Sequence, residues 1–390
     1  MKATWEPLSE RYATVRPRKL LALDGGGIRG VITLKILGEL EQQLRHAVGD
    51  DKPEFRLCQY FDYIAGTSTG AIIATGLALG MSVAELLDFY LQKGKDMFDK
   101  AFLLKQWKSF YESGPLLDML KETFGADTTL DLREGKLKCL LLIVTMNRST
   151  DSPWPISNNP FAKYNQAERA DCNLQIKLHQ LVRASAAAPI YFPPETLQWD
   201  EHDPNKTFVF VDGGTTPYNN PSFLLYRMAT QPAYELNWPI GEGQLLLVSV
   251  GTGSAPSGGN YANLYDTGKK LPGDLMYTIN VDQDINCRTV GRCSYGAPID
   301  RELHDMIPMD EEGHVENLAQ ETQRHFRYIR YNADLSAQGL KQYNLSHIKS
   351  KDVQELDSIR YLNELSQVGE AAAHQVSIKH LGHFAEKPTK

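Results

Sequence analysis

The chain has 390 residues, and its 42% hydrophobic and 23% charged residues are ordinary for a globular protein with a large core. This composition excludes wholesale disorder, a collagen-like repeat and a disulfide-dense mini-fold. The formal net charge of −7 provides no overall basic footprint for a nucleic acid polymer, which argues against a dedicated DNA-binding protein. The five cysteines show no paired CxxC spacing, which argues against a structural zinc site. The sequence contains no metal-ligand cluster, and we expect no metal and no cofactor.

The first twenty residues are polar and contain no continuous apolar segment, which argues against a signal peptide. The longest mildly apolar stretch, residues 70–81, is far shorter than the ~20 residues that a membrane span needs. We therefore expect a cytoplasmic protein that meets a membrane only at its surface.

Short apolar runs bounded by turn residues recur along the chain. Their length and near-continuous hydrophobicity are typical of strands buried on both faces, as in a parallel sheet. The runs are KLLAL at 19–23, YFDYIA at 60–65, KCLLLIVT at 138–145, TFVFV at 207–211 and QLLLVSV at 244–250.

Helical patterns separate these runs. Apolar residues recur every three or four positions from Val31 to Leu44, which predicts a helix with one buried stripe. A second helix is expected directly after Ser68, and a third after Ser82, a suitable N-cap. This alternation predicts an α/β fold, with helices layered on a sheet.

Two loop-rich zones interrupt the alternation. Residues 146–171 are polar and rich in proline and asparagine, and residues 251–273 are rich in glycine and resemble a lid. A strand-like segment at 325–332 and a helical tail around 352–378 follow. We place the boundary in the second zone, which predicts a catalytic domain at 19–255 and a C-terminal extension at 256–390.

A glycine loop, DGGGIRG at 24–30, directly follows the first apolar run and opens the first helix. Glycines let the backbone turn sharply and aim several N–H groups at one point, supported by the helix N-terminus. Such a nest suits either a phosphate group or a developing oxyanion.

A second glycine motif, GTSTG at 66–70, lies between the second apolar run and a helix. This strand–turn–helix context is that of a nucleophile elbow, in which a serine hydroxyl projects from a cramped turn between small residues. We interpret Ser68 as a nucleophile, the alternative being a plain helix N-cap.

A third motif, Asp212-Gly213-Gly214, ends the TFVFV run. A solvated aspartate in a tight turn would explain it when taken alone. In the same sheet as Ser68, however, Asp212 could lie on the same face and accept the serine proton.

Two other enzyme classes compete with this interpretation. The glycine loop also matches the GxGxxG pattern of a dinucleotide-binding oxidoreductase, but Asp24 would then lie beside a pyrophosphate, and the next strand ends in GTSTG instead of a ribose-binding acid. A conventional Ser-His-Asp hydrolase would place its elbow after more strands. His304, His314, His325 and His347 lie in polar sequence without a comparable motif.

Together, DGGGIRG, GTSTG and DGG resemble the oxyanion loop, nucleophile elbow and catalytic-aspartate motif of the patatin-like phospholipase family. NNP at 219–221 and ASAAAPIYFPP at 184–194 are also similar to family segments. Each motif is weak alone, but the ordered set is specific. The resemblance runs from about Lys19 to Gly253.

The resemblance implies a three-layer α/β/α sandwich with a mainly parallel sheet, which hydrolyses acyl esters of phospholipids or related lipids through a Ser/Asp dyad. It implies that Ser68 is the nucleophile and Asp212 the proton acceptor. A non-catalytic storage or binding protein on the same fold is the alternative. The supporting residues are those of the oxyanion loop, Gly25, Gly26, Gly27, Arg29 and Gly30, those of the elbow, Gly66, Thr67, Thr69 and Gly70, and those after the aspartate, Gly213 and Gly214.

A lipid substrate also requires contact with a membrane surface. The stretch at 97–111 mixes large apolar residues with lysines, and on a helix Leu103, Trp107 and Phe110 share one face. We predict peripheral membrane contact there, although the same face could pack on the core. Some bacterial family members are switched on by cyclic nucleotides, so a cyclic-nucleotide activator is a further implied partner.

Overall fold

The computed structural model describes most of the chain. The described residues are 4–49, 51–98, 115–189, 192–200, 202–256, 264–297, 299, 323–356 and 359–386. The stretch predicted to contact membranes, with Leu103, Trp107 and Phe110, lies outside them. No helix within these ranges is both long enough and apolar enough to cross a membrane.

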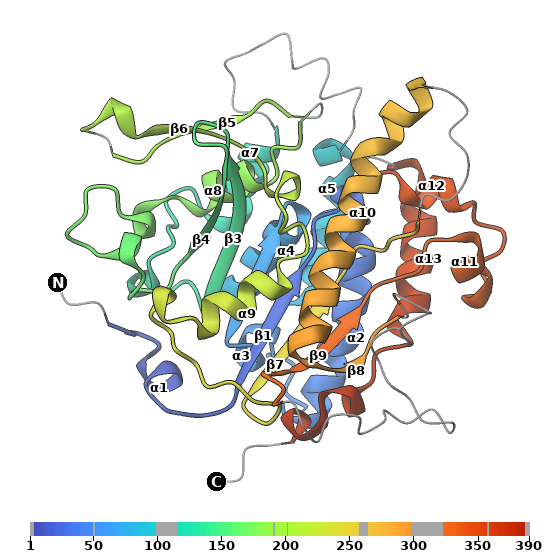
Figure 1. Ribbon diagram of the computed structural model, residues 1–390, viewed down its shortest axis with the longest axis horizontal. Coiled ribbons are helices and arrows are strands. Elements are labelled where there is room, and N and C mark those ends of the chain that lie inside the picture. The colour runs from blue at the N-terminus through green and yellow to red at the C-terminus, as the bar shows by residue number, and fades with distance from the viewer. Residues whose placement is uncertain are drawn as a thin grey trace.

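A nine-stranded sheet forms the centre of the described part (Figure 1). Its strands are β1 (Arg18–Leu23), β2 (Tyr63–Thr67), β3 (Leu140–Asn147), β4 (Ser152–Ser157), β5 (Glu195–Gln198), β6 (Thr207–Asp212), β7 (Leu245–Val250), β8 (Arg292–Tyr295) and β9 (Arg327–Tyr331). They follow the order β5-β6-β3-β2-β1-β7-β9-β8, and β4 also pairs with β3. The strands from β3 to β8 in this order are parallel, whereas β4, β5 and β6 pair antiparallel.

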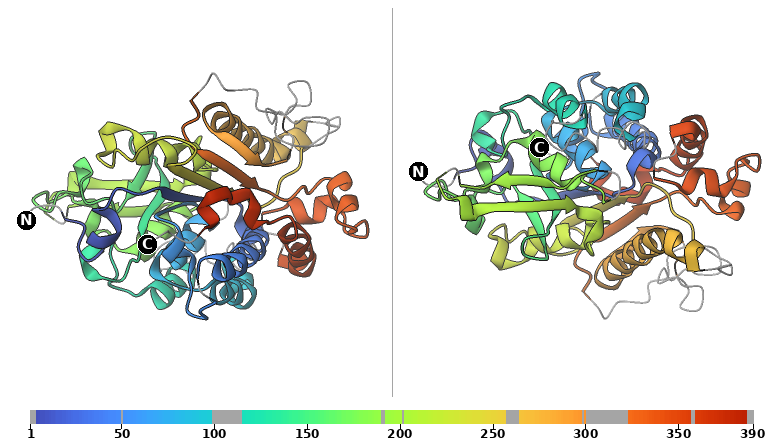
Figure 2. Two further views of the ribbon diagram at one scale, coloured as in Figure 1. Left: turned by 90° about the horizontal axis from the view of Figure 1, so that it is seen from below. Right: turned by 90° about the horizontal axis from the view of Figure 1, so that it is seen from above.

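Helices cover both faces of the sheet (Figure 2). One face carries α9 (Ser222–Thr230) and α10 (Leu264–Val290). The other carries α2 (Gly30–Ala47), α4 (Thr69–Leu79), α5 (Val83–Phe98), α7 (Pro115–Phe124), α8 (Leu178–Ser185) and α13 (Leu362–Ala373). Shorter helices are α1 (Ser9–Tyr12), α3 (Leu57–Tyr60), α11 (Ala337–Gln342) and α12 (Ser350–Gln354). The predicted three-layer α/β/α architecture with a mainly parallel sheet is therefore confirmed.

The central strands are buried on both faces, as their apolar runs predict. Every residue of β2 and β7 is buried, and so is every residue of β1 except Lys19. The 60–65 run is the exception in position, because its first residue ends α3 and the strand begins only at Tyr63. The expected helices after Arg29, Ser68 and Ser82 are α2, α4 and α5.

Strand β6 approaches β2 end to end along one edge of β3. Strand β4 pairs with β3 from Leu142 to Asn147, so β2 and β6 must share the opposite edge. There Thr67, the last residue of β2, pairs with Val144, and Asp212, the last residue of β6, pairs with Thr145. The antiparallel direction of β6 thus brings its carboxyl end to that of β2.

The two zones read as loops contain regular structure. Strand β4 lies in the first zone, where its prolines argue against a strand. The prolines are tolerated because β4 pairs only with β3. The expectation of a loop up to residue 273 was wrong, because α10 begins at Leu264 and only residues 257–263 fall outside the description.

The residues of the predicted C-terminal extension complete the same sheet. Strand β9, within the predicted 325–332 segment, pairs parallel with β7, and β8 pairs with β9. Helices α12 and α13 account for the predicted tail, and α13 packs on α2. The extension is thus joined to the sheet, and the boundary at residue 255 stays a prediction.

Candidate active site

Ser68 occupies a strained turn between β2 and α4. Its φ of 55° and ψ of −122° lie where residues other than glycine are rarely found. The flanking glycines are required by space: a Cβ atom on Gly66 would lie 2.1 Å from the Gly70 carbonyl oxygen, and one on Gly70 would lie 2.3 Å from that of Leu23. The GTSTG sequence therefore folds as the tight elbow that its spacing predicts.

The end-to-end meeting of β2 and β6 brings Ser68 and Asp212 together. The Ser68 hydroxyl donates a hydrogen bond to Asp212 Oδ2 at 2.7 Å. The other carboxylate oxygen accepts one from the Gly214 backbone N–H at 2.6 Å, which holds the carboxylate in place. Gly213 packs under this turn, where an added Cβ atom would lie 2.2 Å from the Val144 carbonyl oxygen.

The electrostatics of Asp212 favour a role as a base. Its side chain is 5% exposed, and burial raises its pKa to about 6, opposed by hydrogen bonds from Ser68 and Gly214 and by the charge of Arg183. A carboxylate with a raised pKa takes a proton more readily than a solvated one. The Asp212 carboxylate can therefore take the proton of the serine hydroxyl during attack.

Neighbouring side chains fix the elbow. The Ser68 backbone N–H donates to Ser185 Oγ at 2.9 Å, and that hydroxyl donates to the Val144 carbonyl at 2.6 Å. Thr67 Oγ1 donates to the Tyr218 carbonyl at 2.7 Å, and the Thr69 hydroxyl bonds with that of Tyr90. Sequence analysis assigned no role to Ser185 or Tyr218, although Ser185 lies in the ASAAAP segment that resembles the family.

The glycine loop lies against the elbow, because a Cβ atom on Gly25 would be 3.2 Å from the Ser68 Cβ. Gly25 N–H donates to the Asn219 carbonyl at 3.0 Å, Ile28 N–H to that of Leu356 at 3.0 Å, and Arg29 N–H to that of Gly26 at 3.2 Å. Gly30 begins α2. Within the described residues, the amides of Gly26 and Gly27 have no acceptor, so these two are available to an oxyanion.

Arg29 forms no ion pair within the described residues, although the charge of Asp24 acts on it. Its side chain is partly buried, and its Nε lies 3.5 Å from the Gly26 carbonyl oxygen. Burial lowers its pKa to about 10, while the charge of Asp24 opposes this shift, so the guanidinium stays protonated at neutral pH. It can meet an anionic group that approaches the loop.

No described histidine hydrogen-bonds to Ser68 or Asp212. His325 bonds through its ring to the Tyr226 hydroxyl, and His347 to the Gln367 amide. His304 and His314 lie outside the described residues. The same ranges contain no group of three or more histidine, cysteine, aspartate or glutamate residues able to hold a metal ion.

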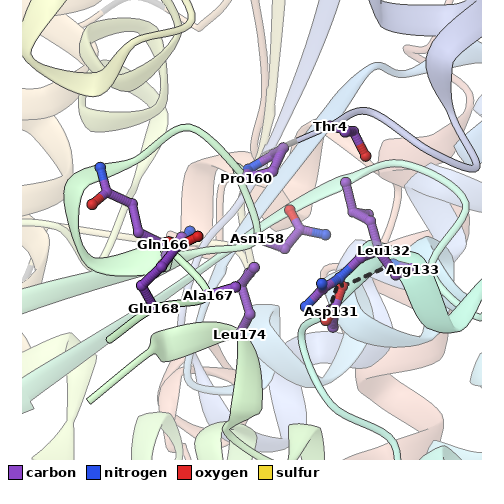
Figure 3. A pocket seen from close by; sticks show the side chains of 11 residues that line it. Thr4, Asp131, Leu132, Arg133, Asn158, Pro160, Gln166, Ala167, Glu168 and Leu174 are labelled. Atoms are coloured by element: carbon purple, nitrogen blue, oxygen red, sulfur yellow. Dashed lines mark hydrogen bonds and ion pairs between the residues drawn. The ribbon is translucent and has the colours of Figure 1, made fainter. Parts of the chain in front are cut away.

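A cavity of about 200 Å³ lies away from this site (Figure 3). It opens beside the amino end of β3, where Asn158 Oδ1 accepts a hydrogen bond from Leu141 N–H, whereas Asp212 adjoins the other end of that strand. Arg133, the cation on its wall, pairs with Asp131 at 2.5 Å. The cavity is therefore separate from the contact between Ser68 and Asp212.

Comparison with known proteins identifies relatives. A cGAMP-activated phospholipase of Escherichia coli (strain TW11681) is 30% identical over 300 residues, which cover 72% of this chain and 77% of that protein. A cGAMP-activated phospholipase of Vibrio cholerae serotype O1 is 33% identical over 220 residues, 53% of this chain and 56% of the relative. Patatin-2-Kuras 1 of Solanum tuberosum is 29% identical over 252 residues, 60% and 62% of the two chains.

One solved structure is a more distant match. VipD from Legionella pneumophila shares 13% identity and a TM-score of 0.35, over 90% of this chain and 67% of that chain, which is too remote to carry an argument.

The family model described as patatin-like phospholipase matches residues 21–225, a span that contains the glycine loop, the elbow and the DGG turn. The chain therefore belongs to the patatin-like phospholipase family.

Proposed function

We propose that the protein is a lipid acyl hydrolase of the phospholipase A type, with Ser68 as the nucleophile and Asp212 as the base. The observation that carries the proposal is the 2.7 Å hydrogen bond from the Ser68 hydroxyl to a buried carboxylate whose pKa is raised to about 6. Family membership supports the hydrolysis of a lipid acyl ester.

In the first half-reaction, Asp212 takes the Ser68 proton as Oγ attacks the ester carbonyl carbon. The carbonyl oxygen becomes an oxyanion. The amides of Gly26 and Gly27, which have no acceptor among the described residues, stabilise it by hydrogen bonding. The bond to the leaving alcohol then breaks, and that alcohol takes the proton from Asp212. The products are an alcohol and an acyl ester on Ser68.

In the second half-reaction, water attacks the acyl ester and gives a proton to Asp212. The same two amides stabilise the second oxyanion. When the bond to Ser68 breaks, the proton passes from Asp212 back to Oγ, and the fatty acid leaves. The balance of atoms requires only water as co-substrate.

Arg29 supports a phospholipid as the substrate. Its guanidinium lies beside the loop that would bind the oxyanion and forms no ion pair with the described residues, so it can pair with the phosphate of a lipid headgroup. The choice between sn-1 and sn-2 esters depends on how the acyl chains lie.

A cyclic dinucleotide is proposed as an activator on the strength of the relatives alone, two of which are named cGAMP-activated phospholipases. Adding cGAMP to the protein with phospholipid vesicles should raise the initial rate of fatty acid release. An unchanged rate over a wide range of cGAMP concentrations contradicts this regulation and leaves the hydrolytic proposal intact.

The test of the proposed function is product analysis on defined phospholipids. The wild-type chain should release fatty acid and lysophospholipid, and Ser68→Ala should release neither while unfolding at a similar temperature. A wild-type protein that binds the vesicles but releases no product would instead favour a non-catalytic binding protein on the same fold.

A further inference from the structure

A buried ion pair joins the glycine loop to β9, which lies between β7 and β8 in the sheet. The Arg330 guanidinium on β9 donates from Nη1 to Asp24 Oδ1 at 2.9 Å and from Nη2 to Oδ2 at 2.5 Å. The two residues lie 306 positions apart, and their side chains are 4% and 1% exposed. Asp24 is the first residue of the DGGGIRG loop, whereas Arg330 lies beyond the part of the chain that matches the family model.

The geometry is that of a rigid fork. A guanidinium that donates two parallel bonds fixes both the position and the plane of the carboxylate, which a lysine cannot do. Burial raises the pKa of Asp24, whereas the charge and the hydrogen bonds of Arg330 oppose that shift. Arg330 Nη1 also donates to Ser249 Oγ on β7 at 2.7 Å, so β9, β7 and the loop are joined at one point.

A second contact route from β9 supports the same loop. Asn332, just after β9, accepts a hydrogen bond from Gly253 N–H at 2.9 Å and donates one to Ser254 Oγ at 2.7 Å. The neighbouring Thr252 donates to the Gly25 carbonyl at 3.0 Å. Thr252 also lies directly under Gly26, since a Cβ atom on that glycine would be 2.1 Å from Thr252 Oγ1.

We propose that Arg330 is a positioning residue for the oxyanion loop, an inference that rests on the proposed function. By holding Asp24 at the start of the loop, it sets the direction in which the Gly26 and Gly27 amides point. It contacts no reacting atom and acts on the loop through Asp24. Because an oxyanion forms only in the transition state, a misplaced loop lowers kcat more than it changes KM.

The experiment compares Arg330→Lys, Arg330→Met and Asp24→Asn with the wild-type full chain on a soluble short-chain ester. Removing one oxyanion donor costs roughly 10²–10³ in kcat, so displacing the loop should lower kcat at least about tenfold, with KM within about twofold. Arg330→Lys keeps the charge and loses the fork. It carries the test if Arg330→Met, which leaves Asp24 buried and unpaired, fails to fold.

Arg18→Met is the matched control. Arg18 is also a buried arginine, 3% exposed, but it lies at the amino end of β1 and donates to the backbone carbonyls of Arg11, Tyr12 and Thr14. It should lower the unfolding temperature and leave kcat of the folded protein unchanged. A double variant, Asp24→Asn with Arg330→Lys, should lose no more kcat than the more affected single variant, because both act through one contact.

Gly26→Val, tested in parallel, separates the two levels of the account. One outcome would be that Gly26→Val loses its activity while folded Arg330→Lys and Asp24→Asn keep the wild-type kcat. This result overturns the positioning role of Arg330 and leaves the oxyanion role of the loop intact. A higher KM at unchanged kcat also overturns it. A fully active Gly26→Val contradicts the oxyanion role of the loop, whereas a wild-type protein that hydrolyses no ester contradicts the proposed function itself.

Discussion

Asp212 accepts a hydrogen bond of 2.7 Å from the hydroxyl of Ser68, although the two residues lie 144 positions apart in the chain. They meet because β2 and β6 run toward each other along one edge of β3. The antiparallel direction of β6 thus brings the two motifs at the strand ends into hydrogen-bond contact. The consequences of this geometry can be tested one residue at a time.

Asp212→Asn should reduce kcat/KM by about 10²–10⁴, because a positioned general base contributes that much and an amide cannot take the serine proton. The size and the turn stay nearly the same. The comparison is with each of the ten histidines changed singly to alanine, assayed on a soluble ester. If a folded histidine variant lost a thousandfold in kcat/KM, the site would work as a triad with that histidine and not as a dyad.

The pH dependence should follow the carboxylate. Burial raises the pKa of Asp212 to about 6, and only the ionised form accepts a proton, so kcat/KM should fall roughly tenfold per pH unit below about pH 6 and level off above it. For stability the sign is opposite. The native carboxyl binds a proton more tightly than an unfolded aspartate with a pKa of about 3.9, so through this group stability rises as the pH falls from about 6 to about 4.

Urea unfolding of wild type and Asp212→Asn between those two pH values checks the second statement. The difference in their unfolding free energies should change with pH in the stated direction. A kcat/KM profile that stays flat down to pH 4 would show that Asp212 is not the titrating base.

Arg29→Met should reduce hydrolysis of a phospholipid at least about fivefold more than hydrolysis of an uncharged monoacylglycerol. The physical reason is the loss of a phosphate-binding guanidinium, whose charge-assisted hydrogen bonds are the stronger kind. Initial rates on both substrates in the same detergent check the difference. Equal losses on the two substrates would assign Arg29 to the shape of the loop instead.

Trp107→Ala should lower activity on phospholipid vesicles far more than on a soluble short-chain ester. An interfacial tryptophan contributes to membrane partitioning, whereas a core tryptophan would cost stability and depress both activities together. Vesicle sedimentation should show the matching loss of binding. Parallel losses on both substrates would favour packing against the core.

The motifs of this site are predictable from sequence because each is a local constraint. Only glycine is small enough at positions 66 and 70 of the elbow. The α/β class follows from apolar runs that alternate with helical stripes, and the resemblance to the family adds the three-layer arrangement. Strand β4 was not predicted because prolines argue against a strand. The prolines fit in β4 because this strand pairs only with β3 and has no second neighbour.

The remaining parts of the site depend on long-range contacts. In the sequence, Asp24 serves only as evidence against a dinucleotide-binding loop, and only the fold brings Arg330 to it from β9. Likewise, the sequence does not show which loop amides lack an acceptor in the described residues, because this depends on long-range bonds such as that from Gly25 N–H to the Asn219 carbonyl. Such pairings leave no local pattern, because each partner is an ordinary residue in its own segment.

The most direct measurement of the central claim is covalent capture by a fluorophosphonate, followed by intact-protein and peptide mass spectrometry. The account predicts one adduct on wild type, located on the peptide that contains Ser68, none on Ser68→Ala, and labelling at least about a hundredfold slower for Asp212→Asn. Labelling of Ser68→Ala at the wild-type rate, or a wild-type adduct on another residue, would contradict it.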